Sequence, residues 1–60
     1  MTKNVVYLCF GGDKEPKLFV NWDEAQSDIT GVSHRTCEGF ETIIEAEKAC
    51  QRATDNFYAT

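Results

Sequence analysis

Apolar residues occur in short blocks along this chain, and the spacing within each block predicts a different element. Val5–Phe10 is β-branched and aromatic and stops at Gly11-Gly12, as expected of a strand that ends in a turn. The polar stretch 11–16 carries turn residues, and Lys17–Val20 supplies a second strand. The N-terminal part of the chain therefore predicts a β-hairpin.

A first helix is predicted to follow the hairpin directly. Asn21 is a good N-cap residue, and Glu24 stands three positions later, as in a capping box. The helix is predicted to run from Trp22 to residue 28 or 29, with Gly31 just beyond its end in a C′ position.

The remaining residues predict one more strand and one more helix. The segment 34–40 contains strand formers and a glycine, and we interpret it as an irregular third strand. Thr42 and Glu45 form a second capping box that opens the last helix. The apolar stripe of this helix is predicted to consist of Ile43, Ile44, Ala46, Ala49, Cys50 and Ala53. We expect one domain over residues 1–60, structured from about 4 to 53, with 54–60 as a frayed tail from which Phe57 and Tyr58 could pack back.

The charge balance argues against strong generic binding to phosphate polymers. The 60 residues include ten acids and six bases, for a formal net charge of −4. Affinity for a phosphate backbone comes mainly from Lys and Arg. Because Lys3, Lys14, Lys17 and Arg35 all precede residue 36, a local basic patch remains compatible with the sequence.

Cysteine usage predicts an intracellular protein, cytoplasmic or nuclear, with reduced thiols. Cys9, Cys37 and Cys50 cannot all pair internally, and no signal peptide is visible. The longest apolar run is far too short to span a bilayer, so no membrane partner is expected. Cys9, Cys37 and His34 could begin a zinc site, but there is no Cys-x-x-Cys pair and no evident fourth ligand. Buried, inert thiols are the favoured interpretation, without metal or other cofactor.

No group of residues predicts catalysis. Gly11-Gly12 is followed by Pro16 and a strand, so it is not a phosphate-binding loop that opens a helix. The carboxylates Asp23, Glu24, Asp28, Glu38, Glu41 and Glu45 include several at helix starts, where capping explains them. We therefore expect a module that is not an enzyme and has no catalytic residues.

The chain resembles the N-terminal hybrid-binding domain of type 1 ribonucleases H, which also occurs in caulimovirus viroplasmin proteins. The resemblance is carried by Tyr7, Gly11-Gly12, Trp22-Asp23-Glu24, Phe40-Glu41-Thr42 and Glu45-Ala46, with eighteen positions from Trp22 to Phe40. It implies an α+β fold of β-β-α-β-α order, with a small three-stranded antiparallel sheet packed against two helices. It also implies that the two helices back the sheet on one side.

The resemblance implies a contact with RNA–DNA hybrid or double-stranded RNA across the minor groove. Trp22 matches a sugar-packing aromatic, Tyr7 lies at the edge of the site, and the loop 31–35 offers backbone amides to RNA 2′-hydroxyls. Lys14 or Lys17 would meet phosphate. The residues assigned to this contact are Tyr7, Lys14, Lys17, Trp22, Gly31, Val32, Ser33, His34, Arg35 and Cys37.

The sequence departs from the family pattern at three positions. The second sugar-packing aromatic is replaced by Cys37, and the basic pair is replaced by Glu38 and Gly39. Because a carboxylate repels phosphate, weak binding is expected. The alternative is a protein-interaction module on the same scaffold, in which Trp22, Tyr7 and Cys37 form an apolar anchor, or a self-association module that uses exposed edges of the first or second strand. Trp22 could also simply cover the edge of the small core.

Overall fold

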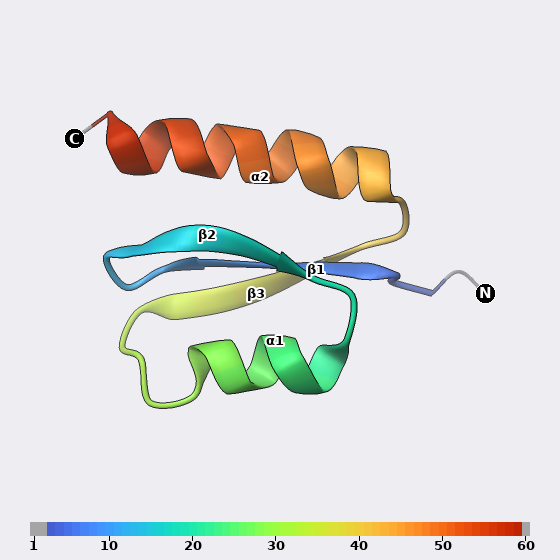
Figure 1. The fold of residues 1–60 in the computed structure, drawn as a ribbon, viewed down its shortest axis with the longest axis horizontal. Helices are drawn as coiled ribbons and strands as arrows, with labels where there is room; N and C mark the ends of the chain where they lie inside the picture. Colours follow the sequence, from blue (N-terminus) through green and yellow to red (C-terminus); the bar gives the residue numbers. More distant parts are fainter. Residues whose placement is uncertain (1–2, 60) are drawn as a thin grey trace.

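The computed structural model describes residues 3–59, and it contains five elements in the predicted order (Figure 1). These are β1 (Val6–Gly11), β2 (Lys14–Phe19), α1 (Trp22–Ile29), β3 (Arg35–Phe40) and α2 (Ile43–Tyr58). The three strands form one antiparallel sheet in the order β2-β1-β3. The α+β fold with β-β-α-β-α order is therefore confirmed.

The hairpin between β1 and β2 is tighter than the sequence suggested. Gly12 and Asp13 both have positive φ, 65° and 60°, which is the backbone of a two-residue type I′ turn. Glycine adopts this conformation without cost, and aspartate is among the residues that tolerate it. As a result β2 begins at Lys14, three residues earlier than predicted.

Both predicted helix starts are confirmed. The Asn21 side chain accepts a hydrogen bond from the Asp23 N–H at 2.9 Å. The Thr42 hydroxyl accepts one from the Glu45 N–H at 3.2 Å. These caps satisfy N–H groups that have no partner within the helix. Gly31, with a φ of 76°, follows the end of α1 as predicted.

The two helices cover opposite faces of the sheet, so the expectation that both lie on one side is wrong (Figure 1). The Ala25 carbonyl of α1 lies 3.5 Å from the Cys9 sulfur on one face of β1. On the other face, Leu8 lines a groove together with Ala49 and Ala53 of α2. The central strand is thus buried on both faces, which explains why its sequence is an apolar run without polar alternation.

Helix α2 is longer than predicted, and residues 54–58 are not a tail. The helix continues to Tyr58, because Phe57 packs beside the groove under α2 and the Tyr58 hydroxyl contacts the Glu15 carboxylate of β2. At its other end, Ile43 and Ile44 are 58% and 66% exposed and do not belong to its buried stripe. Between residues 3 and 59, neither helix is long and apolar enough to cross a membrane.

The core is small and consists of short side chains. Its buried apolar residues are Val6, Leu8, Cys9, Ala25 and Ala46. The alanines let both helices approach the sheet closely, but they bury little apolar area. A domain with such a core depends on additional interactions for its stability.

Candidate nucleic-acid interface

Trp22 presents its indole outward at the first position of α1. Trp22 is 47% exposed as a residue, and the centroid of its ring lies 5.3 Å from that of Tyr7 on β1, with the two planes tilted by 58°. Tyr7 is half-buried and packs against the more exposed indole. The pair forms an aromatic platform to which a ligand has access.

The loop 31–34 lies at the other end of α1. Gly31, Ser33 and His34 are exposed, and Val32 is half-buried. Together with the hairpin turn at Gly12-Asp13, the loop lines an open hollow of about 600 Å³. An eight-residue helix separates the loop from the indole, which corresponds to about 12 Å. The indole and the loop are therefore not adjacent, but both lie in the α1 layer and one extended ligand could contact both.

The indole lies on the flank of α1 that faces β3. Ala25 points at the sheet, and a rotation of about 100° per residue places Asp28 and Trp22 about 60° away on opposite flanks. Asp28 faces Lys14 on β2, with 3.6 Å between the ammonium nitrogen and the carboxylate. Trp22 is therefore directed toward β3, the opposite edge of the sheet.

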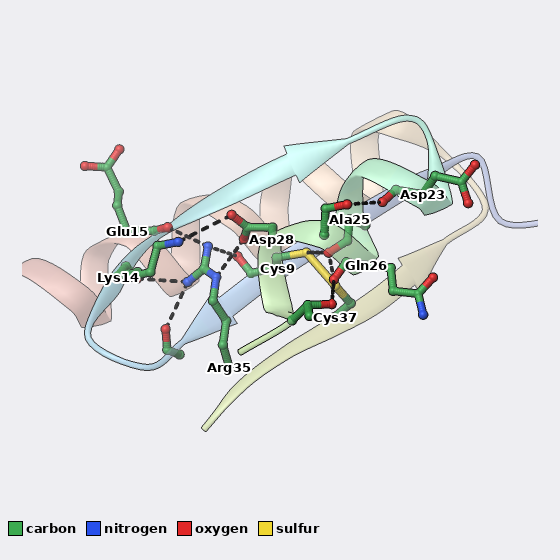
Figure 2. The surroundings of a disulfide bond; sticks show 12 residues. Cys9, Lys14, Glu15, Asp23, Ala25, Gln26, Asp28, Arg35 and Cys37 are labelled. Carbon is green, nitrogen blue, oxygen red and sulfur yellow. Dashed lines mark hydrogen bonds and ion pairs between the residues drawn. A yellow bond between two sulfur atoms is a disulfide. The ribbon is translucent and has the colours of Figure 1, made fainter. Parts of the chain in front are cut away.

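Arg35 is not available to a ligand, because its guanidinium is buried and fully bonded (Figure 2). Its Nε donates to the Asp28 carboxylate at 2.7 Å. Its two terminal nitrogens donate to four backbone carbonyls, those of Cys9, Gly11, Lys14 and Glu15, at 2.9–3.3 Å. All five donors of the guanidinium thus have acceptors. The Arg35 side chain ties the hairpin to α1 and has no free donor for a phosphate.

Asp28 is the anion that balances this buried arginine. Partial burial acts to raise the pKa of Asp28, but the hydrogen bond and charge of Arg35, with a smaller effect from Lys14, outweigh burial and lower the pKa below its usual value. Since Lys14 is engaged with Asp28, it is less free to bind phosphate than predicted. Lys17, exposed on β2, has no contact of this kind with Asp28.

Cys9 and Cys37 are joined in a disulfide, so the prediction of two reduced thiols is wrong for this pair (Figure 2). The two residues stand opposite each other on β1 and β3, with 4.2 Å between their Cα atoms. Cys50 is a free cysteine. Within residues 3–59 no cluster of three His, Cys, Asp or Glu side chains could hold a metal ion.

Glu38 and Cys37 point to opposite faces of β3, because successive strand residues alternate. Cys37 faces Ala25 of α1, at 3.5 Å from its carbonyl. Glu38 stands opposite Leu8 and lines the groove under α2. The structure therefore brings Trp22, Tyr7 and Cys37 to the α1 side, and it places the carboxylate of Glu38 on the other side of the same edge strand.

Sequence reasoning missed Asp28 and the structural role of Arg35. No local pattern signals a contact between a helix residue and a strand residue seven positions later. The disulfide had a weak signal: once Tyr7 is aligned with Gly39, antiparallel register places Cys9 opposite Cys37.

The chain matches the model of a known protein family. A family model described as Ribonuclease H1 N-terminal domain matches residues 7–50, which include nearly all of β1, the rest of the sheet, α1 and the first half of α2. Comparisons with curated proteins and with solved structures returned no match.

Proposed function

The chain belongs to the ribonuclease H1 N-terminal domain family, a family of nucleic-acid-binding domains, and from this premise we propose that it is a non-catalytic module that binds RNA-containing duplexes weakly. The ligand would be an RNA–DNA hybrid or double-stranded RNA, contacted through its minor groove. We also propose an intracellular site of action, because the expected partner is a nucleic acid.

The outward indole of Trp22 is the observation that carries this proposal. An aromatic ring beside an edge strand can pack on a sugar without reading a base. The amides of loop 31–34 lie about 12 Å away, at the far end of α1. A minor groove that is wide and shallow, as in A-like duplexes, suits two contacts at this separation better than the minor groove of B-DNA, which is only about 6 Å wide.

Weak affinity follows from the charges around the platform. Arg35 is buried, Lys14 faces Asp28, and Lys17 is left as an exposed base on β2. With Lys17 as one phosphate contact and Lys14 as at most a second, affinity should fall about three- to tenfold between 50 and 200 mM salt. Titration of labelled hybrid, double-stranded RNA and double-stranded DNA at both salt concentrations checks this expectation. Equal affinity for all three duplexes would contradict the proposed preference for RNA-containing duplexes. No binding at micromolar protein in low salt would contradict nucleic-acid binding itself and favour a protein partner.

Replacing Trp22 with alanine should weaken binding to the hybrid by about five- to a hundredfold, because stacking of a nucleotide on an aromatic ring contributes about 1–3 kcal/mol. The change should be independent of salt, since no charge is altered. Tyr58→Ala is the matched control, because Tyr58 is also an exposed aromatic, 63% exposed, but belongs to the end of α2. If both variants lose affinity equally, Trp22 is not the contact.

Replacing Glu38 with lysine should strengthen hybrid binding several-fold at low salt and add about one to the salt slope. Glu38 lies on the α2 side of β3 but on its open edge strand, so a lysine there would attract a phosphate of a duplex bound along this edge, whereas the carboxylate repels it. Glu47→Lys makes the same change in net charge at an exposed position on α2 and should have a smaller effect. Identical gains in the two variants would show that only net charge matters and that β3 does not border the site.

A further inference from the structure

The two edges of the sheet are unequal, and only one of them can accept another strand. The strand order β2-β1-β3 leaves β2 and β3 each with a single neighbour. Edge strand β2 contains Pro16, which has no N–H to donate. The second edge strand, β3, has no proline, so every N–H group that points away from β1 is available. An open edge of this kind is a template for pairing with a further strand.

The register shows which groups of β3 point outward. In an antiparallel pair, residues without mutual hydrogen bonds have Cα atoms about 4.5 Å apart, against about 5.5 Å for bonded pairs. Cys9 and Cys37 are 4.2 Å apart, so they form a non-bonded pair. The N–H and C=O groups of Cys37 therefore face away from β1. By alternation, those of Arg35 and Gly39 do the same.

We propose that β3 pairs antiparallel with β3 of a second copy of this chain, with Cys37 opposite Cys37 at the two-fold axis. This register uses all the outward groups: Arg35 pairs with Gly39, Cys37 with Cys37, and Gly39 with Arg35. If each strand is shifted by one residue relative to this register, only two pairs of outward-facing residues remain instead of three. The resulting dimer has a continuous six-stranded sheet with Pro16 on both outer edges.

The side chains favour the same register. Thr36 of each copy stands opposite Glu38 of the other, so two hydroxyls face two carboxylates and can donate to them. The register centred on Glu38 would instead place two carboxylates directly opposite each other, which is destabilising. Thr36 and Glu38 are both exposed in the single chain and are free to make these contacts.

Helix α1 is positioned to join the interface. The Ala25 carbonyl is equally distant, 3.5 Å, from the Cys9 and Cys37 sulfurs, which places the helix above the seam between β1 and β3. With strands about 4.8 Å apart, this seam lies one strand spacing from the two-fold axis. The two α1 helices would then be about 10 Å apart, within the range of packed helices.

The centres of the two helices also coincide with the axis. Ala25 is near the middle of α1 and contacts Cys37, the residue on the axis. The flank of α1 that faces β3 carries Trp22 and Ile29, so antiparallel packing places Trp22 of one copy beside Ile29 of the other. Exposed apolar surface of the indole would be buried there.

Salt distinguishes this pairing from nucleic-acid binding. Two copies with a net charge of −4 repel each other, so screening should strengthen self-association. Duplex binding should weaken under the same change. Because duplex binding and self-association would both use the open side of β3, added hybrid should also dissociate the dimer. The pairing itself does not depend on whether nucleic acid binds.

Changing Thr36 tests the register by charge. Sedimentation equilibrium of the oxidised chain should show a monomer–dimer equilibrium in 0.5 M salt. Thr36→Lys should lower the dissociation constant of the dimer about tenfold, because the new lysine of each copy pairs with Glu38 of the other. Thr36→Glu should raise the dissociation constant to a similar extent. Gln51→Lys and Gln51→Glu, at an exposed position on α2, make the same changes in net charge and should cause only small shifts.

Amide hydrogen exchange provides a readout at the strand itself. The N–H groups of Cys37 and Gly39 should become protected as the protein concentration rises through the dimerisation range. A monomer at all concentrations up to about 1 mM would overturn the proposal. The proposal would also be overturned if the Thr36 variants and the Gln51 variants changed dimerisation equally. Dimerisation without protection of the Cys37 and Gly39 N–H groups would overturn it as well.

Discussion

Arg35→Met is expected to lower the free energy of unfolding by about 3–5 kcal/mol, the usual cost of removing one partner from a buried ion pair. The guanidinium is buried, and each of its five donors has an acceptor. Without it, the Asp28 carboxylate, whose side chain is 10% exposed, keeps only Lys14 at 3.6 Å. Four backbone carbonyls of the hairpin also lose a donor. Urea denaturation of the oxidised protein measures the difference.

Arg35→Lys should recover only a small part of this loss. An ammonium has three donors around one nitrogen, and it cannot reproduce the planar arrangement that reaches both Asp28 and the hairpin carbonyls. Arg52→Met is the matched control, because Arg52 is an exposed arginine on α2 and its removal should change stability by less than about 0.5 kcal/mol. If Arg35→Met is as mild as Arg52→Met, the buried network does not stabilise the fold.

The Arg35–Asp28 pair also predicts how stability responds to acid. The pKa of Asp28 in the folded chain is lower than in the unfolded chain. The unfolded state therefore binds the proton more tightly, and the contribution of this pair is fully present above the unfolded pKa, near 4. It is lost as the pH falls through the lower, folded pKa. In Arg35→Met this part of the acid sensitivity should disappear, because the charge that lowers the pKa of Asp28 is gone.

Reduction of the Cys9–Cys37 disulfide should lower the free energy of unfolding by about 3–4 kcal/mol. The bond joins residues 28 positions apart, and a closed loop of this length restricts the unfolded chain by roughly that amount. The loss is of the order of the whole net stability of a domain with so small a core. Thermal or urea denaturation with and without a dithiol reductant provides the measurement.

A Cys50→Ala variant keeps this experiment free of thiol exchange. Cys50 is the free cysteine of the described residues 3–59, and its replacement should leave the difference between oxidised and reduced protein intact. Cys9→Ala combined with Cys37→Ala should reproduce the reduced state at every reductant concentration. Equal stability of the oxidised and reduced forms would mean that the cross-strand bond contributes nothing beyond what sheet pairing already provides.

The start of strand β2 shows what local sequence signals fail to predict. The polar stretch 11–16 predicted a turn, but the start of β2 was placed three residues too late, because Lys14–Pro16 look like loop residues in isolation. They are held in the strand by pairing with β1 and by carbonyl contacts to Arg35, which lies about twenty residues away. A residue with turn propensity adopts the strand when distant contacts outweigh its local preference.

In the candidate interface, too, local sequence signals predicted some positions and only contacts between distant residues decided the others. Trp22 was placed correctly at an exposed helix start, because the Asn21 N-cap positions the residue within one turn. Arg35 was assigned to the ligand, yet it is buried, since only the folded chain brings Asp28 and the hairpin carbonyls around it. Cys37 was assigned to the same surface as a free thiol, and its pairing with Cys9 required the β1–β3 register.

The sequence by itself determined the order of the elements, their caps and the exposed aromatic, because these depend on interactions across three or four residues. Tertiary structure alone decided which face of the sheet each helix covers, which charged residues are buried and which cysteines meet. Those outcomes depend on contacts between residues that are far apart in the chain, and on the competition among several partners for one small core.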